Sequence, residues 1–478
     1  MSPGTYARGF GWNLLFNLVT KLATPIIGVL VARKLGPETM GAYMVLVTVM
    51  TFADLFREAG IARVYLNEPE MTDSRERGYA GLSAVIGLAL ALLLAVGSWP
   101  LAKLFGSPQL AIGLLFGAAA MCLNGLSTIP QAKLLREGRL KEAGFAETLG
   151  SVLSSVYALA GVLAGFGFLA LASQLLVRSF IFLVATYRMS PCTYTRGEKG
   201  LFRKIAGVSG SLTGVNLLWV AFSVGDQAIA GKMLGLAAAG LYGTGKLIVT
   251  TADVIAKPLQ QTVTVAFAHR VNDQELIART LHKSLLAFLI AIAPIYAAVA
   301  FLADPIVLSV LGTKYAGTVQ VLPALCLYGA VVYNGSFAGN ALLMIGKQNI
   351  ALYGWLGTMT ILGIVLTIFW TALPLLALAW VFAGALTLVN ASTFTFALRY
   401  FPPARKTVMQ AAKAICCFLL TAAFAALIAR LQISDLAKLA TAMFVLPAVH
   451  LLFLGTFFAK KPSGMLSPAG IKQLWQSL

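Results

Sequence analysis

The sequence predicts an all-α polytopic membrane protein, and two observations support that fold class. The 478-residue chain is 59% hydrophobic and only 11% charged, with a mean hydropathy of +0.84, whereas soluble chains are roughly 25% charged. Its Lys and Arg residues also cluster mainly on alternate sides of successive apolar segments. Because charge is costly in lipid, the few charges must lie between membrane helices or in a polar cavity.

Windows of about 20 apolar residues, the length that spans a bilayer, predict about 14 transmembrane helices. The first six lie at about 10–32, 40–66, 79–100, 109–130, 143–165 and 167–187. Eight more lie at about 208–230, 236–262, 284–303, 319–344, 349–371, 373–397, 409–429 and 438–459. Loops between them reach only about 20 residues, which leaves no room for a soluble domain.

The basic residues predict the orientation of these helices. The connections after the second, fourth, sixth, eighth and twelfth helices are rich in Lys and Arg, as in Lys133 to Lys141 and Arg399 to Lys413. The opposite connections are poorer, and the one near residue 165 has none. The positive-inside rule therefore places both termini in the cytoplasm. The net charge of +19 then faces an anionic leaflet and requires no nucleic acid.

The chain also contains an internal repeat. The stretch LGPETMGAY at 35–43 returns as LGLAAAGLY at 234–242, 199 residues later. A second pair, LLREGR at 134–139 and LLMIGK at 342–347, has an offset of 208. The repeat predicts two six-helix lobes, 1–190 and 191–400, related by a pseudo-two-fold axis along the membrane normal. Two extra helices and a cytoplasmic tail follow at 401–478.

Several stretches in these repeats resemble a known family. They are GWNLL at 11–15, VARKLGPETMGAY at 31–43, EAGI at 58–61 and GDQAIAGKMLGLAAAGLY at 225–242. Together they resemble the polysaccharide-biosynthesis and O-antigen flippases of the multidrug/oligosaccharidyl-lipid/polysaccharide exporter superfamily. The resemblance implies two lobes around a central cavity, alternating access, and transport of a lipid-diphosphate-linked oligosaccharide to the outer leaflet.

The same resemblance separates branches of the superfamily. Lipid II flippases carry several cavity arginines in the first lobe, whereas here the first two helices offer Lys21 and Arg57. We therefore favour the O-antigen or exopolysaccharide branch.

A polar stripe marks the eighth predicted helix. Tyr242, Lys246, Thr250, Asp253 and Lys257 are spaced by four, four, three and four residues, which places them on one helical face. A polar face inside a membrane should line water or protein. It is either a cavity wall in which Lys246 meets a diphosphate, or an internal ladder in which Asp253 pairs with Lys257.

The second helix carries Asp54, Arg57 and Glu58 within one turn. The planar guanidinium of Arg57 suits phosphate oxygens, although the two carboxylates could simply neutralise it. Asp54 and Asp253 occupy equivalent repeat positions, and burial could raise their pKa values enough to couple transport to an ion. Ion pairing would act in the opposite direction.

Other intramembrane polar residues complete the candidate site. Lys21 lies four residues before Pro25, which removes a helix hydrogen bond at that carbonyl and predicts a hinge or an ordinary tolerated proline. Arg178 either contacts the cavity or braces the first lobe. Asn124 and Asn334 either bind sugar hydroxyls or link helices. We expect Asp226 to be an interfacial charge or the partner of Lys232.

No cofactor, metal site or catalytic set is predicted. GxxxxGK at 240–246 is followed by Leu247 rather than Ser or Thr and lies in an apolar span, so it does not predict a phosphate-binding loop. The five cysteines form no CxxC pair, and the three histidines are scattered. The chain is therefore not expected to be an enzyme.

The leading hypothesis is a flippase in the bacterial inner membrane. It would move a polyprenyl-diphosphate-linked oligosaccharide from the inner to the outer leaflet for export of O-antigen, exopolysaccharide or a related surface glycan. Its partners would be that lipid, the bilayer, and a polysaccharide polymerase or other assembly proteins. The alternatives are a cation-coupled multidrug exporter, a lipid II flippase, a membrane-embedded glycan enzyme and a non-transporting scaffold.

Overall fold

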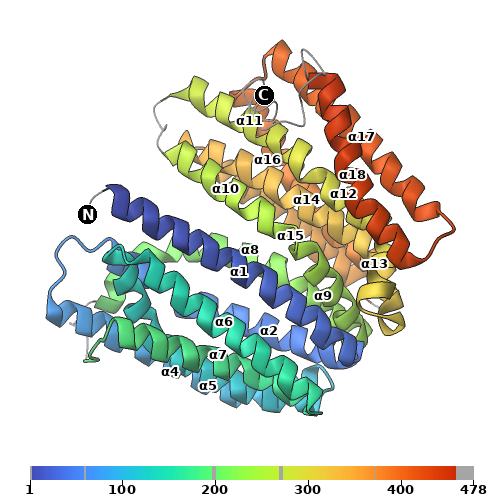
Figure 1. The fold of residues 1–478 in the computed structure, drawn as a ribbon. Helices are drawn as coiled ribbons and strands as arrows, with labels where there is room; N and C mark the ends of the chain where they lie inside the picture. Colours follow the sequence, from blue (N-terminus) through green and yellow to red (C-terminus); the bar gives the residue numbers. More distant parts are fainter. Residues whose placement is uncertain (1–2, 59–60, 196–200, 269–272, 371, 459–478) are drawn as a thin grey trace. The chain divides into compact units, whose positions relative to one another are not determined.

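The secondary structure of this protein is helical (Figure 1). The computed structural model describes residues 3–58, 61–195, 201–268, 273–370 and 372–458, and these contain no strand. Eleven helices in these segments are long and apolar enough to cross a membrane. The all-α membrane class is therefore confirmed, while the count of fourteen stays a prediction.

The chain forms two compact units, Met1–Thr244 and Gly245–Leu478. The first contains α1 (Pro3–Lys34), α2 (Pro37–Glu58), α3 (Ile61–Leu66), α4 (Asp73–Leu104), α5 (Pro108–Arg136), α6 (Leu140–Leu163), α7 (Phe168–Met189) and α8 (Leu201–Leu234). The boundary falls within α9 (Leu236–Thr250). The second contains α10 (Asp253–Ala268), α11 (Gln274–Ala291), α12 (Ala293–Phe301), α13 (Ala303–Val310), α14 (Ala316–Met344), α15 (Gln348–Ile368), α16 (Leu375–Tyr400), α17 (Arg405–Arg430) and α18 (Asp435–Phe458).

The two units are defined by which helices contact one another, whereas the predicted lobes are defined by the internal sequence repeat. The helix α8 joins the first unit because it packs along α2. The predicted lobe boundaries near residues 190 and 400 therefore stay a prediction.

Two predicted helices are interrupted. The predicted helix at 236–262 is divided between α9 and α10 at Thr251 and Ala252. There, the hydroxyls of Thr250 and Thr251 bond to carbonyls three residues back, at 2.9 and 2.6 Å, which competes with the regular helix ladder. The predicted helix at 284–303 begins earlier, at Gln274, and is interrupted before Pro294 because proline has no N–H to donate.

The helices of the first unit pack on one another through α5 and α7 (Figure 1). α1 lies along α6, which packs on α7, while α5 packs against α4, α7 and α2. The buried centre includes Leu46, Leu110, Leu114 and Met121, each fully buried. Large apolar residues elsewhere face outwards, such as Leu93 on α4 at 67% exposed, as expected for a helix bounded by lipid.

The repeated LG motif forms a reciprocal helix contact. A Cβ added at Gly41 of α2 would lie 1.7 Å from the carbonyl oxygen of Leu236, and one added at Gly240 of α9 would lie 1.8 Å from that of Pro37. The two glycines are equivalent positions of the repeat. Small residues allow such close backbone approach between membrane helices, so this pair brings the starts of α2 and α9 together.

The second repeated motif forms matching helix ends. Gly138 and Gly346 have φ of 71° and 70°, the left-handed conformation that glycine adopts readily. In each case the following N–H bonds to the first leucine carbonyl at 2.9 Å, from Arg139 to Leu134 and from Lys347 to Leu342. The same cap at both copies is what a duplication predicts.

A polar network holds α3, α4 and α5 at one end of the first unit. Arg136 donates to the carbonyls of Tyr65 and Glu68 at 2.6 and 2.7 Å. Lys133 pairs with Glu76 at 2.6 Å. These two basic residues lie on α5, which extends six residues beyond the predicted helix end at 130, so they are structural ties as well as topology charges.

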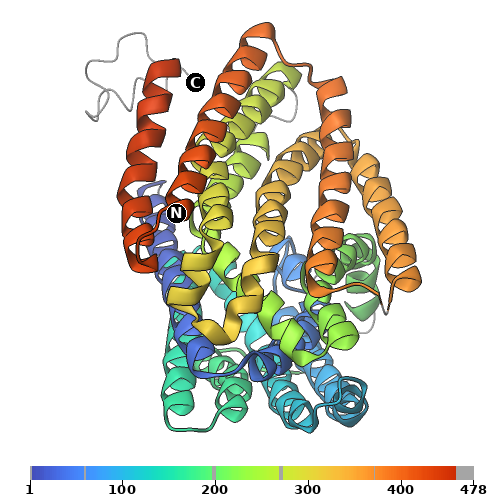
Figure 2. The same cartoon turned by 90° about the vertical axis from the view of Figure 1, so that its right-hand side faces the viewer.

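In the second unit, α17 and α18 lie side by side (Figure 2). His450 of α18 connects three helices, because its Nδ1 lies 2.8 Å from Thr421 Oγ1 and its Nε2 2.7 Å from the Ile290 carbonyl oxygen. An imidazole with both nitrogens paired fixes the position of α18 on α11 and α17.

Gly41→Ala should destabilise the protein, because its new methyl group would overlap a backbone carbonyl that cannot rotate away. Overpacking of this kind costs about 1–3 kcal/mol or more. We expect a lower thermal midpoint in detergent. Gly36→Ala is the matched control, since no atom lies within 4 Å of its added Cβ. Equal midpoints for the two variants would contradict the reciprocal contact.

Cys192 should react slowly with maleimides. Burial, with Glu76 adding to it, raises the pKa of its thiol to about 12, and the thiolate is the reactive form. At pH 7.5 alkylation should be about a thousandfold slower than for an unperturbed thiol, rising about tenfold per pH unit towards the pKa. Peptide mapping by mass spectrometry, with denatured protein as the reference, measures this rate. Rapid native labelling at pH 7.5 would rule out the buried thiol.

Candidate functional site

A polar cavity of about 250 Å³ lies within the first unit. Its walls come from α2, α5, α6 and α7, and they include four of the predicted site residues. These are Asp54, Arg57, Asn124 and Arg178. Residues far apart in the sequence therefore meet at one place inside a bundle that is otherwise largely apolar.

Arg57 is the most constrained charge of this cavity. Its side chain is 11% exposed and its Nε lies 2.8 Å from Asp54 Oδ1. Its Nη1 donates to Thr128 Oγ1 at 2.6 Å, and its Nη2 lies 3.4 Å from Glu58 Oε1. The guanidinium therefore bridges two helices, α2 and α5. This geometry is compatible with phosphate binding by Arg57 and equally with its neutralisation by the two carboxylates.

Arg178 reaches the cavity from α7. Its Nη2 lies 2.6 Å from Glu147 Oε1 of α6, and the two side chains are 50% and 41% exposed. Arg178 therefore both lines the cavity and braces α7 on α6. Glu147 was missed by the sequence analysis, although an acidic residue within the predicted span at 143–165 was a usable signal.

Lys21 does not belong to the lining of this cavity as described. It is half-buried on α1, whose neighbouring Thr20 donates to Thr148 of α6 at 3.0 Å. α1 is helical throughout Pro3–Lys34 with Pro25 inside it. The hinge role of Pro25 and the substrate role of Lys21 stay predictions.

The polar stripe of the eighth predicted helix is not a single helical face. The interruption at Thr251 and Ala252 separates Lys246 and Thr250 on α9 from Lys257 on α10. Tyr242, the first member of the stripe, is fully buried, and its hydroxyl donates to Asp226. The side chain of Asp253 lies outside the described part of the chain, so its pairing and its coupling role are untested.

The remaining candidates lie in the second unit. Lys246 Nζ lies 4.9 Å from the centre of the Tyr328 ring, a cation–π distance. Thr250 is exposed and Lys257 half-buried. Asn334 of α14 donates to its own helix at Ala330 O, 3.2 Å away, and lines a largely apolar groove of about 480 Å³. The helix-linking and hydroxyl-binding roles of Asn334 both stay predictions.

Asp226 is a buried carboxylate rather than an interfacial charge. It is fully buried, and it accepts a hydrogen bond from the hydroxyl of Tyr242 at 3.0 Å and from the Gln227 N–H at 2.8 Å. The reason is the glycine contact, which brings the start of α9 towards α2 and α8. Lys232 donates to the Leu104 carbonyl at 2.9 Å.

A family profile for polysaccharide biosynthesis proteins matches residues 29–320, which is more than half of the chain. The chain belongs to the polysaccharide biosynthesis protein family. The family resemblance inferred from the sequence is therefore confirmed.

Curated relatives of this polysaccharide biosynthesis protein carry transport in their names. It is 26% identical over 329 residues to the succinoglycan biosynthesis transport protein ExoT of Rhizobium meliloti (strain 1021), covering 68% of this chain and 66% of that one. It is 23% identical over 303 residues to a protein of Shigella flexneri named "Putative O-antigen transporter", covering 59% of this chain and 71% of that one. The chain thus spans about two thirds of the relatives' length.

Solved structures share its fold. The lipid II flippase MurJ in an inward closed conformation matches with a TM-score of 0.73 and 13% identity, covering 95% of this chain and 98% of that one. An inward-facing multidrug resistance MATE family transporter of the MOP superfamily matches with a TM-score of 0.60 and 14% identity, covering 80% and 98%. At such identities the likeness shows the fold alone.

The charge balance of the cavity differs from the expected cationic site. Its lining contains two guanidinium groups, Arg57 and Arg178, and three carboxylates, Asp54, Glu58 and Glu147. Each arginine has a carboxylate partner within 2.8 Å. In this polysaccharide biosynthesis protein an anionic ligand must therefore compete with acidic side chains for the arginines.

A double-mutant cycle should detect the Arg57–Thr128 contact. Arg57→Gln and Thr128→Val should be coupled by about 1–2 kcal/mol in the free energy of unfolding, because the hydrogen bond involves a charged, mostly buried donor. Unfolding in mixed detergent micelles provides the measurement. The matched cycle of Arg178→Gln with Thr128→Val should be additive. Coupling of equal size in both cycles would contradict this geometry.

Proposed function

We propose that the protein is a flippase for a polyprenyl-diphosphate-linked oligosaccharide. It moves the headgroup from the inner to the outer leaflet of the bacterial inner membrane, for export of an exopolysaccharide, O-antigen or related glycan. Support comes from the family, from relatives named as transporters of succinoglycan biosynthesis and O-antigen, and from the fold shared with a lipid II flippase. No part of this function needs an enzyme activity.

The observation that carries the proposal is the polar cavity within an apolar helix bundle. Arg57 and Arg178 supply planar donors suited to phosphate oxygens. Neutral groups on α5, namely Asn124, Ser127 and Gln131, supply donors and acceptors for sugar hydroxyls. An isoprenoid tail needs no protein cavity, because it can remain in the bilayer while the headgroup crosses.

The carboxylates give the cavity a means of releasing its ligand. When a diphosphate binds, Arg57 exchanges Asp54 for phosphate, and the returning carboxylate displaces the diphosphate later. This exchange keeps the guanidinium paired at each stage, which avoids a bare charge in a low-dielectric site. A proton or cation taken up by Asp54, and by Asp253 at the equivalent repeat position, would couple transport to an ion gradient.

The remaining predicted residues complete the proposal. Lys21, Lys246, Thr250 and Lys257 contact the headgroup along its path, and Pro25 acts as a hinge. Two six-helix lobes then rock about the site in alternating access. Both termini lie in the cytoplasm, and a polysaccharide polymerase receives the product at the outer face.

A cation-coupled multidrug exporter is the second candidate. The specific observation that favours it is the excess of carboxylates over arginines in the cavity, since cationic substrates prefer an acidic site. The fold that this chain shares with a multidrug transporter is also compatible with this candidate.

Lipid extraction from cells with the gene deleted distinguishes the two candidates. The flippase predicts accumulated diphosphate-linked oligosaccharide of full repeat-unit length and loss of surface glycan. Normal lipid intermediates with increased sensitivity to cationic dyes would instead support the drug exporter and overturn the flippase.

Variants extend this experiment to the cavity. Arg57→Gln should reduce surface glycan at least about tenfold, because a neutral amide loses the charge-assisted phosphate contacts. Arg188→Gln, an exposed change at the end of the same helix as Arg178, is the control and should complement fully. Full complementation by Arg57→Gln at equal membrane level would remove the cavity from the mechanism.

A further inference from the structure

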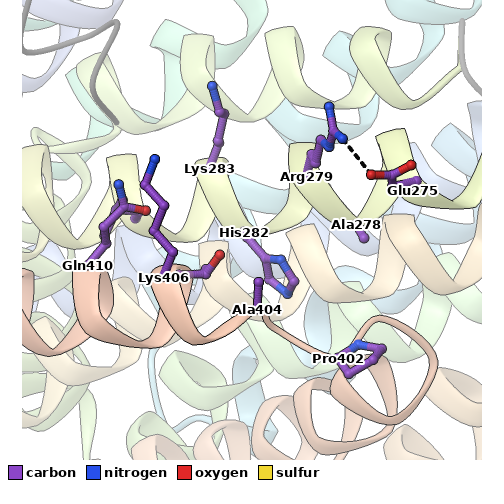
Figure 3. A pocket seen from close by; sticks show the side chains of 11 residues that line it. Glu275, Ala278, Arg279, His282, Lys283, Pro402, Ala404, Lys406 and Gln410 are labelled. Atoms are coloured by element: carbon purple, nitrogen blue, oxygen red, sulfur yellow. Dashed lines mark hydrogen bonds and ion pairs between the residues drawn. The ribbon is translucent and has the colours of Figure 1, made fainter.

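A second cavity lies at the start of α11 and α17 in the second unit. It has a volume of about 550 Å³ and is lined by Arg279 and Lys283 of α11 and by Lys406 of α17, with Glu275 as an acidic member. Figure 3 shows Arg279 and Lys283 projecting from one helix and Lys406 and Gln410 from the other, with His282 between them. Three cations against one carboxylate give this cavity a positive charge.

The cations are exposed to solvent rather than locked in ion pairs within the protein core. Lys283 and Lys406 are exposed, and Arg279 pairs with Glu275, the two side chains being 67% and 76% exposed. Exposed pairs of this kind are weak. An incoming phosphate can therefore replace Glu275 as the partner of Arg279 at little cost.

The apolar groove that contains Asn334 adjoins this basic cavity. His282, Leu286 and Thr407 line both, so the two are continuous. Beyond them the groove is walled mainly by apolar side chains, including Leu289, Phe394 and Ile415. A basic entrance followed by an apolar channel matches a molecule with an anionic head and a hydrocarbon tail.

The wall between the two parts is rigid. His282 Nε2 lies 3.1 Å from the carbonyl oxygen of Phe401, a buried residue in the turn before α17. Pro402 and Pro403 follow in the same turn and restrict its backbone. The junction between the basic cavity and the groove is therefore preformed.

The depth of the groove suits one leaflet. From Lys406 to Ile415 on α17 is about 14 Å at 1.5 Å per residue. That is close to half of the roughly 30 Å hydrocarbon core. The basic end of the site also agrees with the charge pattern, since Lys283 and Lys406 belong to connections that the positive-inside rule places in the cytoplasm.

We propose that this combined site, Arg279, Lys283 and Lys406 with the groove, binds an anionic phospholipid of the cytoplasmic leaflet. The phosphate lies among the three cations and one acyl chain fills the groove. Basic pockets between membrane helices on the cytoplasmic side bind anionic headgroups by the same electrostatics. The bound lipid would fasten α17 to α11, α14 and α16.

Native mass spectrometry of the full-length protein in detergent tests this proposal. Phosphatidylglycerol is the probe, with phosphatidylcholine, glycerol phosphate and a polyprenyl diphosphate as comparisons. Phosphatidylglycerol should be retained at least about tenfold more tightly than phosphatidylcholine. Soluble glycerol phosphate should bind weakly because it has no tail.

Variants separate the headgroup and tail contributions. Lys283→Gln combined with Lys406→Gln should weaken phosphatidylglycerol binding at least about tenfold, whereas Lys413→Gln, on the same helix but outside the cavity, should not. Ala411→Phe fills the groove and should weaken binding, whereas Ala412→Phe, one residue on and outside the lining, should leave it unchanged.

Three outcomes would overturn the proposal. They are equal retention of phosphatidylglycerol and phosphatidylcholine, binding of glycerol phosphate as tight as that of the lipid, and displacement of phosphatidylglycerol by polyprenyl diphosphate at equal concentration. The last would make this a substrate site. Because surface glycan is measured separately, failure here leaves the flippase proposal intact.

Discussion

The close contact between Gly41 and Gly240 is the constraint on which the first unit depends. At each glycine the neighbouring carbonyl occupies the space where a side chain would begin. This contact brings α9 against α2, and α2 in turn packs along α8. The buried Asp226–Tyr242 hydrogen bond then closes the junction between α8 and α9. The helix that carries Arg57 is therefore held at its opposite end by two residues that have no side chain.

Polar groups in a low-dielectric bundle impose a second condition. Each buried polar group must find a partner inside the protein, because lipid offers none. Arg57 is shared between α2 and α5, Arg178 with α6, and His450 among three helices. These ties are placed between helices, so they hold α2 to α5, α7 to α6, and α18 to α11 and α17.

The cavity of the first unit combines arginine and carboxylate in near balance, and the proposed function asks such a site both to bind and to release a ligand. A purely cationic cavity would hold a diphosphate tightly, and its like charges would repel one another without the ligand. Instead, Asp54 and Glu147 pair with Arg57 and Arg178, so the cavity's own carboxylates neutralise the two arginines. Specificity for a glycan would then come from the neutral groups of α5 beside the arginines, and affinity from how readily those arginines exchange partners.

The sequence alone determined the fold class, the family and much of the cavity. Composition and periodicity are properties of single segments, so the apolar helices were predictable, and the intramembrane charges Asp54, Arg57 and Arg178 were recognisable because charge is rare in lipid. The repeat likewise predicted equivalent local geometry, seen in the caps at Gly138 and Gly346. Only the tertiary structure decided the partners. Glu147, Thr128 and Asp226 gain their roles from side chains on other helices. The interruption at Thr251 removed a face that regular helical spacing had predicted. Spacing along one helix reports which side chains share a face, whereas pairing and burial depend on what packs against that face.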